Sequence, residues 1–187
     1  MAKAKIATVL AILTVGGMAG YFFWHDYAQG TVTLSISDPP QLQNGNNPQY
    51  DSSILHIYIT FTEIDVHQAG FGTTNSTGWY ALVRSPTTVD MISALNNPRT
   101  LASTNLATGT YDQLRFPVST AIVTFSSTGN VAYTIPSSSL KVSITGGGFQ
   151  SSPGAKVNLQ LTMSFSNSEI LAMNGNLTPH ASAQVVG

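Results

Sequence analysis

The chain has 187 residues, no cysteine and a formal net charge of −1. Charged residues make up 8% of it, against about 25% in ordinary soluble domains. Serine and threonine fill the gap with 43 residues. The absence of cysteine excludes disulfides and thiolate metal sites, and the lack of a basic patch argues against nucleic-acid binding. Such a polar, nearly uncharged surface suits either an acidic medium outside the cell or a glycosylated cell surface, and both interpretations stay open.

The N-terminus begins with Lys3 and Lys5 and continues as an uncharged segment from Ile6 to Trp24. A helix of that length spans about 28 Å, close to the roughly 30 Å hydrocarbon core of a bilayer. The lysines favour the cytoplasmic side, so the rest of the chain is expected outside the cell. We therefore predict an N-terminal signal or anchor helix in residues 1–30 and one extracellular domain in residues 31–187.

The fate of this segment stays open. Signal peptides usually carry an apolar stretch of about 7–15 residues and a cleavage site of small residues, whereas this stretch is longer and has a bulky end. That favours a retained anchor, and Gly16 with Gly20 forms a GxxxG pattern that supports helix pairing. A helix like that of type IV pilins is a third interpretation, although it lacks the usual acidic residue near its start.

Residues 31–37 alternate Val32, Leu34 and Ile36 with hydroxyl residues, which predicts a half-buried strand. Residues 38–53 are rich in Pro, Asn, Gln and Gly and predict a loop. In residues 53–67 the apolar positions change parity, which predicts a bulge or break near Thr62 because the apolar face would otherwise turn outward.

Beyond a loop at 69–78 and a strand at 79–83, residues 88–97 carry a possible cap at Thr88 and a stop at Pro98, which predicts a short helix. Further strands are expected at 110–118, 121–125, 130–135, 140–145, 156–165 and 177–186. Many short strands at this spacing predict a mainly β fold, an antiparallel β-sandwich with one short helix.

Glu63, Asp65 and His67 stand at alternate positions, so on a strand they point to one face. Two carboxylates with an imidazole could bind a divalent cation. The alternative is that they line a solvent-facing strand edge while Ile64 and Val66 point inward.

No motif of a hydrolase nucleophile, zinc protease, P-loop or dinucleotide site occurs, so we expect no enzyme and no cofactor. Trp79, Tyr80 and Tyr111 are candidate stacking residues of a glycan-binding module. Asn75 and Asn176 each begin an N-x-S/T sequon and are candidate glycosylation sites.

Several stretches in order carry a family resemblance: GTVTLSISDPP at 30–40, ILHIYITFTEIDVH at 54–67, GWYAL at 78–82, TTVDMISALNN at 87–97, ATGTYDQLRFPV at 107–118, IPSSSLKVSITGGGF at 135–149 and NLTPHASA at 176–183. They resemble a family of uncharacterised β-domains in archaeal and bacterial surface proteins and lipoproteins. The resemblance implies a fold and no reaction. The uncharged Ser/Thr-rich composition is also similar to that of archaeal cell-surface filament subunits.

From this layout we expect a non-enzymatic structural protein of the cell surface, a filament or pilus-type homopolymer assembled by strand addition. The expected donor is residues 30–37, with Val32, Leu34 and Ile36 as its apolar side chains. One alternative is a single-pass accessory subunit that binds other membrane proteins and the bilayer through Ile6 to Trp24. The other is an extracellular glycan- or cation-binding module.

Overall fold

The computed structural model describes residues 14, 16–18, 20–21, 28–38, 50–72, 77–95, 97–136 and 139–187. The described residues between 14 and 21 are helical, but most of the predicted N-terminal hydrophobic helix lies outside the described residues. Within the described part of the chain, no helix combines the length and apolar character that crossing a membrane requires.

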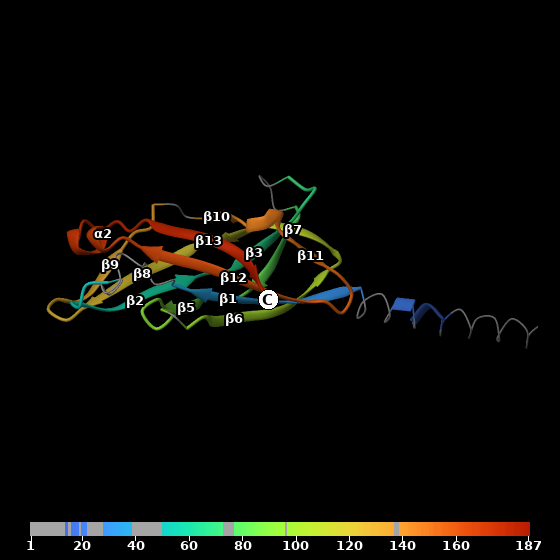
Figure 1. The fold of residues 1–187 in the computed structure, drawn as a ribbon, viewed down its shortest axis with the longest axis horizontal. Helices are drawn as coiled ribbons and strands as arrows, with labels where there is room; N and C mark the ends of the chain where they lie inside the picture. The colour runs from blue at the N-terminus through green and yellow to red at the C-terminus, as the bar shows by residue number, and fades with distance from the viewer. Residues whose placement is uncertain are drawn as a thin grey trace, which may run out of the picture.

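The described residues are mainly β (Figure 1). The strands are β1 (Gln29–Ser37), β2 (Ile54–Phe61), β3 (Ile64–Gln68), β4 (Trp79–Val83), β5 (Thr87–Asp90), β6 (Arg99–Ala107), β7 (Gly109–Phe116), β8 (Val118–Phe125), β9 (Gly129–Tyr133), β10 (Leu140–Ser143), β11 (Phe149–Ser151), β12 (Lys156–Phe165) and β13 (Pro179–Val186). A 3-10 turn, η1 (Thr145–Gly147), and a short helix, α2 (Asn167–Ala172), complete the described elements.

One sheet, here called the β1 sheet, has the order β13-β12-β1-β6. β1 pairs in parallel with β12 from Thr31↔Lys156 to Ser37↔Thr162, and antiparallel with β6 on its other side. The predicted strand at 31–37 is therefore confirmed, and it is a central strand. The predicted mainly β fold with antiparallel pairing is confirmed for the other pairs of named strands, and the β1–β12 pair departs from it because it is parallel.

The other two sheets continue into each other. The β2 sheet has the order β5-β2-β8-β9, and the β7 sheet has the order β10-β7-β3-β4 with β11 also on β7. β2 runs into β3 across Thr62 and Glu63, while β7 runs into β8 across Pro117, whose carbonyl accepts a 3.1 Å bond from the Thr62 N–H. The predicted break near Thr62 is confirmed. The break between β2 and β3 lies beside the break between β7 and β8.

The predicted helix at 88–97 is wrong. Residues 87–90 form β5, in which Val89 pairs with Ile59 of β2, and a turn over 91–94 follows. The Asp90 carboxylate stabilises that turn by accepting hydrogen bonds from the Ile92 N–H and the Ser93 hydroxyl. The short α-helix is instead α2, which follows β12 and buries Ile170.

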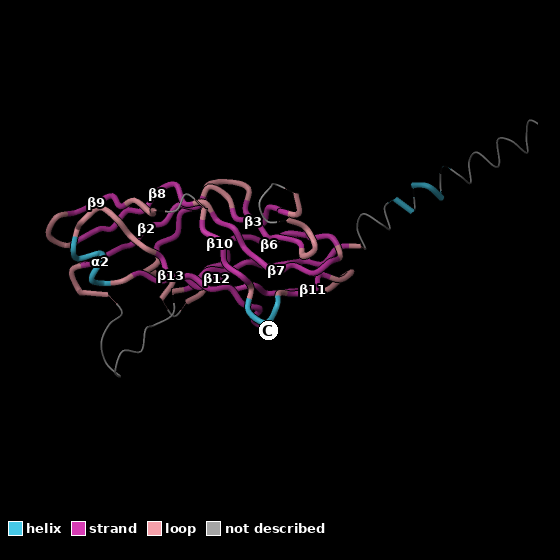
Figure 2. The backbone as a smooth tube through the Cα atoms, turned by 90° about the horizontal axis from the view of Figure 1, so that it is seen from above, coloured by secondary structure: helices cyan, strands magenta, loops and turns pink. Residues whose placement is uncertain are grey.

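The domain is elongated, with α2 and β9 at one end and β11 near the start of β1 at the other (Figures 1 and 2). Its buried apolar residues form one cluster that takes side chains from every sheet, such as Leu34 of β1, Ile59 of β2 and Leu114 of β7, each 0% exposed. Every sheet thus has one apolar face on a shared core, and the opposite faces are available for polar chemistry.

Candidate functional site

The three predicted cation ligands are separated by the break between β2 and β3. Glu63 precedes β3 and is exposed, whereas Asp65 and His67 lie within β3 and are 4% and 1% exposed. The Asp65 carboxylate accepts a 3.1 Å hydrogen bond from Nε of Arg115 and a second from its Nη2. Nδ1 of His67 lies 2.9 Å from Oδ1 of Asp112.

This arrangement does not form the expected cation site. Among the residues that the structure describes, no three His, Asp or Glu side chains gather closely enough to hold a metal ion. The alternative is confirmed in that Ile64 and Val66 point inward and Glu63 is exposed. It is wrong for Asp65 and His67, which are buried although they point away from the core side of β3. The Asp65 carboxylate is instead held by the Arg115 guanidinium, and the His67 imidazole by the Asp112 carboxylate, both from β7.

The outer face of the β7 sheet carries a cross-strand row of polar side chains. Register places Trp79 of β4 opposite His67 of β3, His67 opposite Gln113 of β7, and Gln113 opposite Ser143 of β10. We call these four residues the polar row. A register shift after His67 places Asp112 beside the row, although simple alternation would send its side chain to the other face.

The indole of Trp79 is enclosed by cationic and imidazole groups. The Arg115 guanidinium lies 4.5 Å from the ring centroid, Nζ of Lys141 lies 5.7 Å away, and the His67 ring centroid is at 4.9 Å. These cation–π and ring contacts occupy the surface that a stacking ligand would need. Trp79 is therefore a packed member of the row rather than an open platform.

The prediction that Tyr111 is a stacking residue is wrong, because Tyr111 belongs to the core. It is 0% exposed, its ring stacks on Phe149 at 5.4 Å, and its hydroxyl donates to the Ala107 carbonyl. Burial, with a contribution from neighbouring Tyr80, raises the pKa of the Tyr111 phenol to about 12. Tyr80 is exposed and meets the edge of Tyr111 at 6.0 Å.

Three buried polar atoms of the polar row have no hydrogen-bond partner among the described residues: Nε1 of Trp79, Nε2 of His67 and Oε1 of Gln113. Each such atom costs about 1–3 kcal/mol of desolvation when nothing compensates it. A cavity of about 310 Å³ adjoins the row, lined by Asp112, Gln113, Ser143, Ile144 and Gly147. The row is thus polar, costly to the fold and next to an open space.

A second candidate feature is the seat of β1, by which we mean the slot between β12 and β6 that this strand fills. Val32, Leu34 and Ile36 are each 0–1% exposed, as the alternating pattern predicts. At the start of the strand, a Cβ on Gly30 would lie only 2.7 Å from Oγ of Ser151 and 2.8 Å from the Ser152 carbonyl. The glycine therefore allows a close approach that any side chain would prevent.

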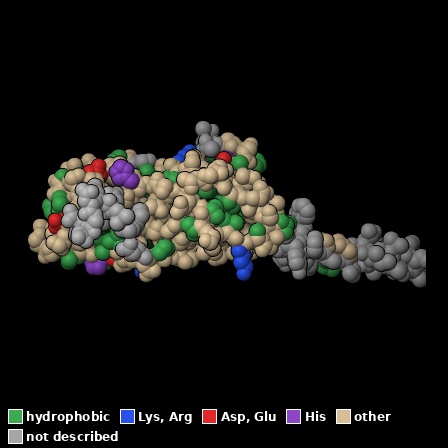
Figure 3. Space-filling model, in the orientation of Figure 1, with side chains coloured by type: hydrophobic (Ala, Val, Ile, Leu, Met, Phe, Trp, Pro, Cys, Tyr) green, Lys and Arg blue, Asp and Glu red, His purple; other side chains and the backbone are tan. Residues whose placement is uncertain are grey.

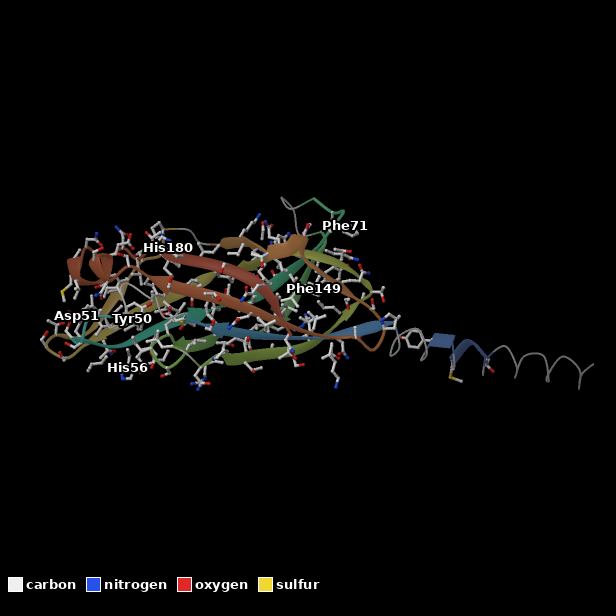
Figure 4. All side chains as sticks on the ribbon, viewed as in Figure 1. Tyr50, Asp51, His56, Phe71, Phe149 and His180 are labelled. Carbon is white, nitrogen blue, oxygen red and sulfur yellow. The ribbon has the colours of Figure 1, made fainter. Side chains whose placement is uncertain are left out.

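The other end of β1 is held by a buried carboxylate. Asp38, 0% exposed, accepts a 2.5 Å hydrogen bond from the Tyr50 hydroxyl, which also accepts a bond from the Phe165 N–H. The Asp38 N–H donates to the Ala94 carbonyl. Tyr50 lies where β1 ends (Figure 4). Both ends of the strand are therefore fixed by specific contacts.

A histidine–carboxylate pair lies on the β2 sheet. Nδ1 of His56 is 2.8 Å from Oδ2 of Asp90, and the Ser93 hydroxyl donates to the same oxygen at 2.7 Å. Since the serine binds the carboxylate and not the imidazole, this is not the arrangement of a nucleophilic triad. His56 and His180 lie on opposite borders of the domain (Figure 4).

The Asp90 carboxyl is tuned by opposing effects. Its burial raises the pKa, but hydrogen bonds from His56, Ser93 and the Ile57 N–H outweigh that effect and hold the pKa below its usual value. The group is thus a structural anion that joins β2 to the turn after β5.

The two sequons differ in what the structure describes. Asn75 lies outside the described residues. Asn176 is exposed just before β13, and its backbone forms an isolated parallel β-bridge with Thr134. Glycan occupancy at both positions remains a prediction.

The face of the domain drawn in Figure 3 is mostly polar and carries few charged side chains. On the outer face of the β1 sheet, hydroxyl and amide side chains bond across the strands: Thr33 to Ser103, Gln160 to Ser37 and Gln184 to Gln160. The low charge of the sequence thus becomes a neutral hydrogen-bonding sheet face.

The sequence pattern did not single out Gln113 and Ser143 of the polar row, or Asp112 and Arg115 beside it. Alternation along 110–118 signals which residues share a face, but the bulge at Asp112 has no separate signal in the sequence.

A comparison with curated proteins finds no match, and neither does one with solved structures. A family model described as a domain of unknown function (DUF4382) matches residues 29–178. The match begins at the start of β1 and ends just before β13, so it covers both the seat of β1 and the polar row. The chain therefore belongs to the DUF4382 family of domains of unknown function.

Proposed function

We propose that the protein is a non-enzymatic structural subunit of the cell surface that assembles with further copies of itself by exchanging β1. The observation that carries this proposal is the place of β1: the first strand after the apolar N-terminal segment occupies the centre of a sheet. In this proposal the domain is a β-sandwich, with the β1 sheet as one layer and the joined β2 and β7 sheets as the other.

The energy of β1 supports exchange. Burying Val32, Leu34 and Ile36 contributes about 1.5–3 kcal/mol each, or about 5–9 kcal/mol together. The whole stability of a domain is about 5–15 kcal/mol. A domain whose seat stays unfilled is therefore close to unfolding, and a β1 must always be supplied, by the same chain or by another.

The contacts of the seat are the same for either source. Gly30 fits against the Ser151–Ser152 backbone, the three apolar side chains enter the core, and Asp38 binds Tyr50. Exchange of an identical element between copies needs no new interface, which makes it an inexpensive route to assembly. Residues 39–49 join β1 to the rest of the domain and extend at most about 3.5 Å each.

Surface location rests on the sequence. Lys3 and Lys5 before the segment from Ile6 to Trp24 orient the domain outward, and the neutral hydroxyl-rich sheet face suits that environment. An exchanged β1 is compatible with an N-terminal segment that is removed or packed in a filament. If the segment is retained in the bilayer, the GxxxG pattern of Gly16 and Gly20 favours the second candidate, a single-pass subunit of a membrane complex.

Negative-stain microscopy of surface fractions tests the proposal. Wild-type protein is expected in polymers, and a variant with Val32, Leu34 and Ile36 changed to Ser is expected to give none. The matched control changes Thr31 and Thr33 on the outer face of the same strand to Ser and is expected to polymerise. Monomers alone in the wild-type fraction would reject assembly by exchange.

A further inference from the structure

We propose that the cavity beside the polar row binds a neutral polyhydroxylated ligand, namely a sugar residue. This inference is independent of β1 exchange, because the cavity lies on the outer face of the β7 sheet. Its volume of about 310 Å³ falls at the small end of ligand pockets, about 300–1,000 Å³. That size suits a single sugar ring.

The lining is polar and supplies both kinds of hydrogen-bonding group. The Asp112 carboxylate, which is 41% exposed, and Oε1 of Gln113 are acceptors, while the Ser143 hydroxyl both donates and accepts. Asp112 is oriented by Nδ1 of His67 at 2.9 Å. The Asp112 carboxylate is thus held in place before a ligand arrives.

The unpartnered atoms point to a hydrogen-bonding ligand at this place. Oε1 of Gln113 belongs to a cavity-lining residue, and it has no partner among the described residues. Nε2 of His67 and Nε1 of Trp79 continue the same row away from the cavity. Native proteins rarely leave buried polar atoms unpaired, and here three occur on three adjacent strands.

The surrounding charges select a neutral ligand. Asp112 lines the cavity and opposes a carboxylate or phosphate, while Lys141 of β10 lies over Trp79 and opposes an amine. Hydroxyl groups donate to Asp112 and Gln113 and accept from Ser143, so they match the lining without adding charge. A polyol satisfies this set best.

The glycines after β10 form a turn beside the cavity that carries no side chains at these positions. Gly146, Gly147 and Gly148 all have positive φ, and a Cβ on Gly148 would lie 2.1 Å from the Tyr111 carbonyl. The turn therefore packs its backbone directly onto β7 and places no side chains of these three residues over the cavity.

Calorimetric titration of the full-length protein with glucose, galactose, mannose and N-acetylglucosamine tests the proposal, with methyl glucoside as the form linked within a glycan. Glucuronate and glucosamine are the charged counterparts of glucose. A ligand of about a dozen heavy atoms is expected to bind with a Kd of about 1–10 mM. At least one neutral sugar, free or as the glycoside, is expected to bind at least about tenfold more tightly than both charged sugars.

Variants locate the site. Gln113→Leu is expected to weaken binding about tenfold, and Ser143→Ala is a second variant should Gln113→Leu fail to fold. Gln160→Leu makes the same change on the β1 sheet and is expected to bind like the wild type. The proposal is overturned if no neutral sugar gives saturable heat, if a charged sugar binds as well, or if the folded cavity variants bind unchanged.

Discussion

The close packing of Gly30 at the start of β1 can be tested by adding one methyl group at this position. In Gly30→Ala the new Cβ would meet Oγ of Ser151 at 2.7 Å, the Ser152 carbonyl at 2.8 Å and the Ala155 carbonyl at 3.3 Å. Two of these three atoms are backbone. The same backbone is tied to β1, because the Thr31 N–H donates to the Ala155 carbonyl at 2.8 Å and the Gly154 N–H to the Gln29 carbonyl at 3.0 Å. The strand start therefore cannot move aside without losing hydrogen bonds.

Overpacking of this kind costs about 1–3 kcal/mol. With an m-value of about 2 kcal/mol per molar urea, the midpoint of unfolding is expected to fall by about 0.5–1.5 M. Urea unfolding of the monomeric protein, followed by circular dichroism, measures it. The matched control is Gly72→Ala, since a Cβ on Gly72 would meet nothing within 4 Å. An unchanged or raised midpoint in Gly30→Ala would refute the close approach at the start of β1.

Three further predictions concern charge and pH. The pKa of Tyr111 is raised from its ordinary 10.0 to about 12, so the stability that the neutral phenol contributes is complete below pH 10 and is lost as pH rises through about 12. In Tyr111→Phe, stability should therefore fall less steeply with rising alkaline pH than in the wild type, and identical curves would contradict this. The pKa of Asp90 is lowered, so the stability that its carboxylate contributes is present above pH 3.8 and is lost as pH falls through the pKa of the folded state. In thermal melts, Asp90→Ala should lower the free energy of unfolding by about 2 kcal/mol at pH 7 and by less at pH 2. An equal loss at both pH values would speak against the hydrogen-bonded anion. Arg115→Met leaves the buried Asp65 carboxylate without its partner and should cost about 3–5 kcal/mol, more than the same change combined with Asp65→Leu; a double variant less stable than the single one in urea would contradict that order.

Local pattern predicted the strands that have one clear apolar face. The alternation at Val32, Leu34 and Ile36 and the parity change near Thr62 each correspond to an observed feature, because burial imposes a period of two on a strand. β6 was not predicted, since its pairing with β1 shifts register and breaks the alternation.

The error at 88–97 has a tertiary cause. A possible cap at Thr88 and a stop at Pro98 fit a helix locally, but Val89 pairs with Ile59 and the Asp90 side chain closes a turn. Pairing with β2 outweighs the weak local preference.

The polar row and the residues beside it depend on contacts between strands that sequence spacing does not reveal. Asp65 and His67 were singled out correctly as residues that share a face, yet their partners Arg115 and Asp112 come from another strand. The bulge brings Asp112 to that face, and only the register reveals it.

Engineered disulfides test β1 exchange most directly, because the chain has no cysteine of its own. The hydroxyl oxygens of Thr33 on β1 and Ser103 on β6 lie 3.3 Å apart, so Thr33→Cys with Ser103→Cys links β1 to whichever domain seats it. The control pair, Thr33→Cys with Ser182→Cys, lies two strands apart and is offset by four residues along the strands. The two positions are therefore about 16 Å apart, which is too far to bridge.

In non-reducing gels of surface fractions from producing cells, exchange predicts a ladder of covalent multimers for the Thr33–Ser103 pair and monomers for the control. A Thr33–Ser103 variant that runs only as an internally cross-linked monomer would contradict the account.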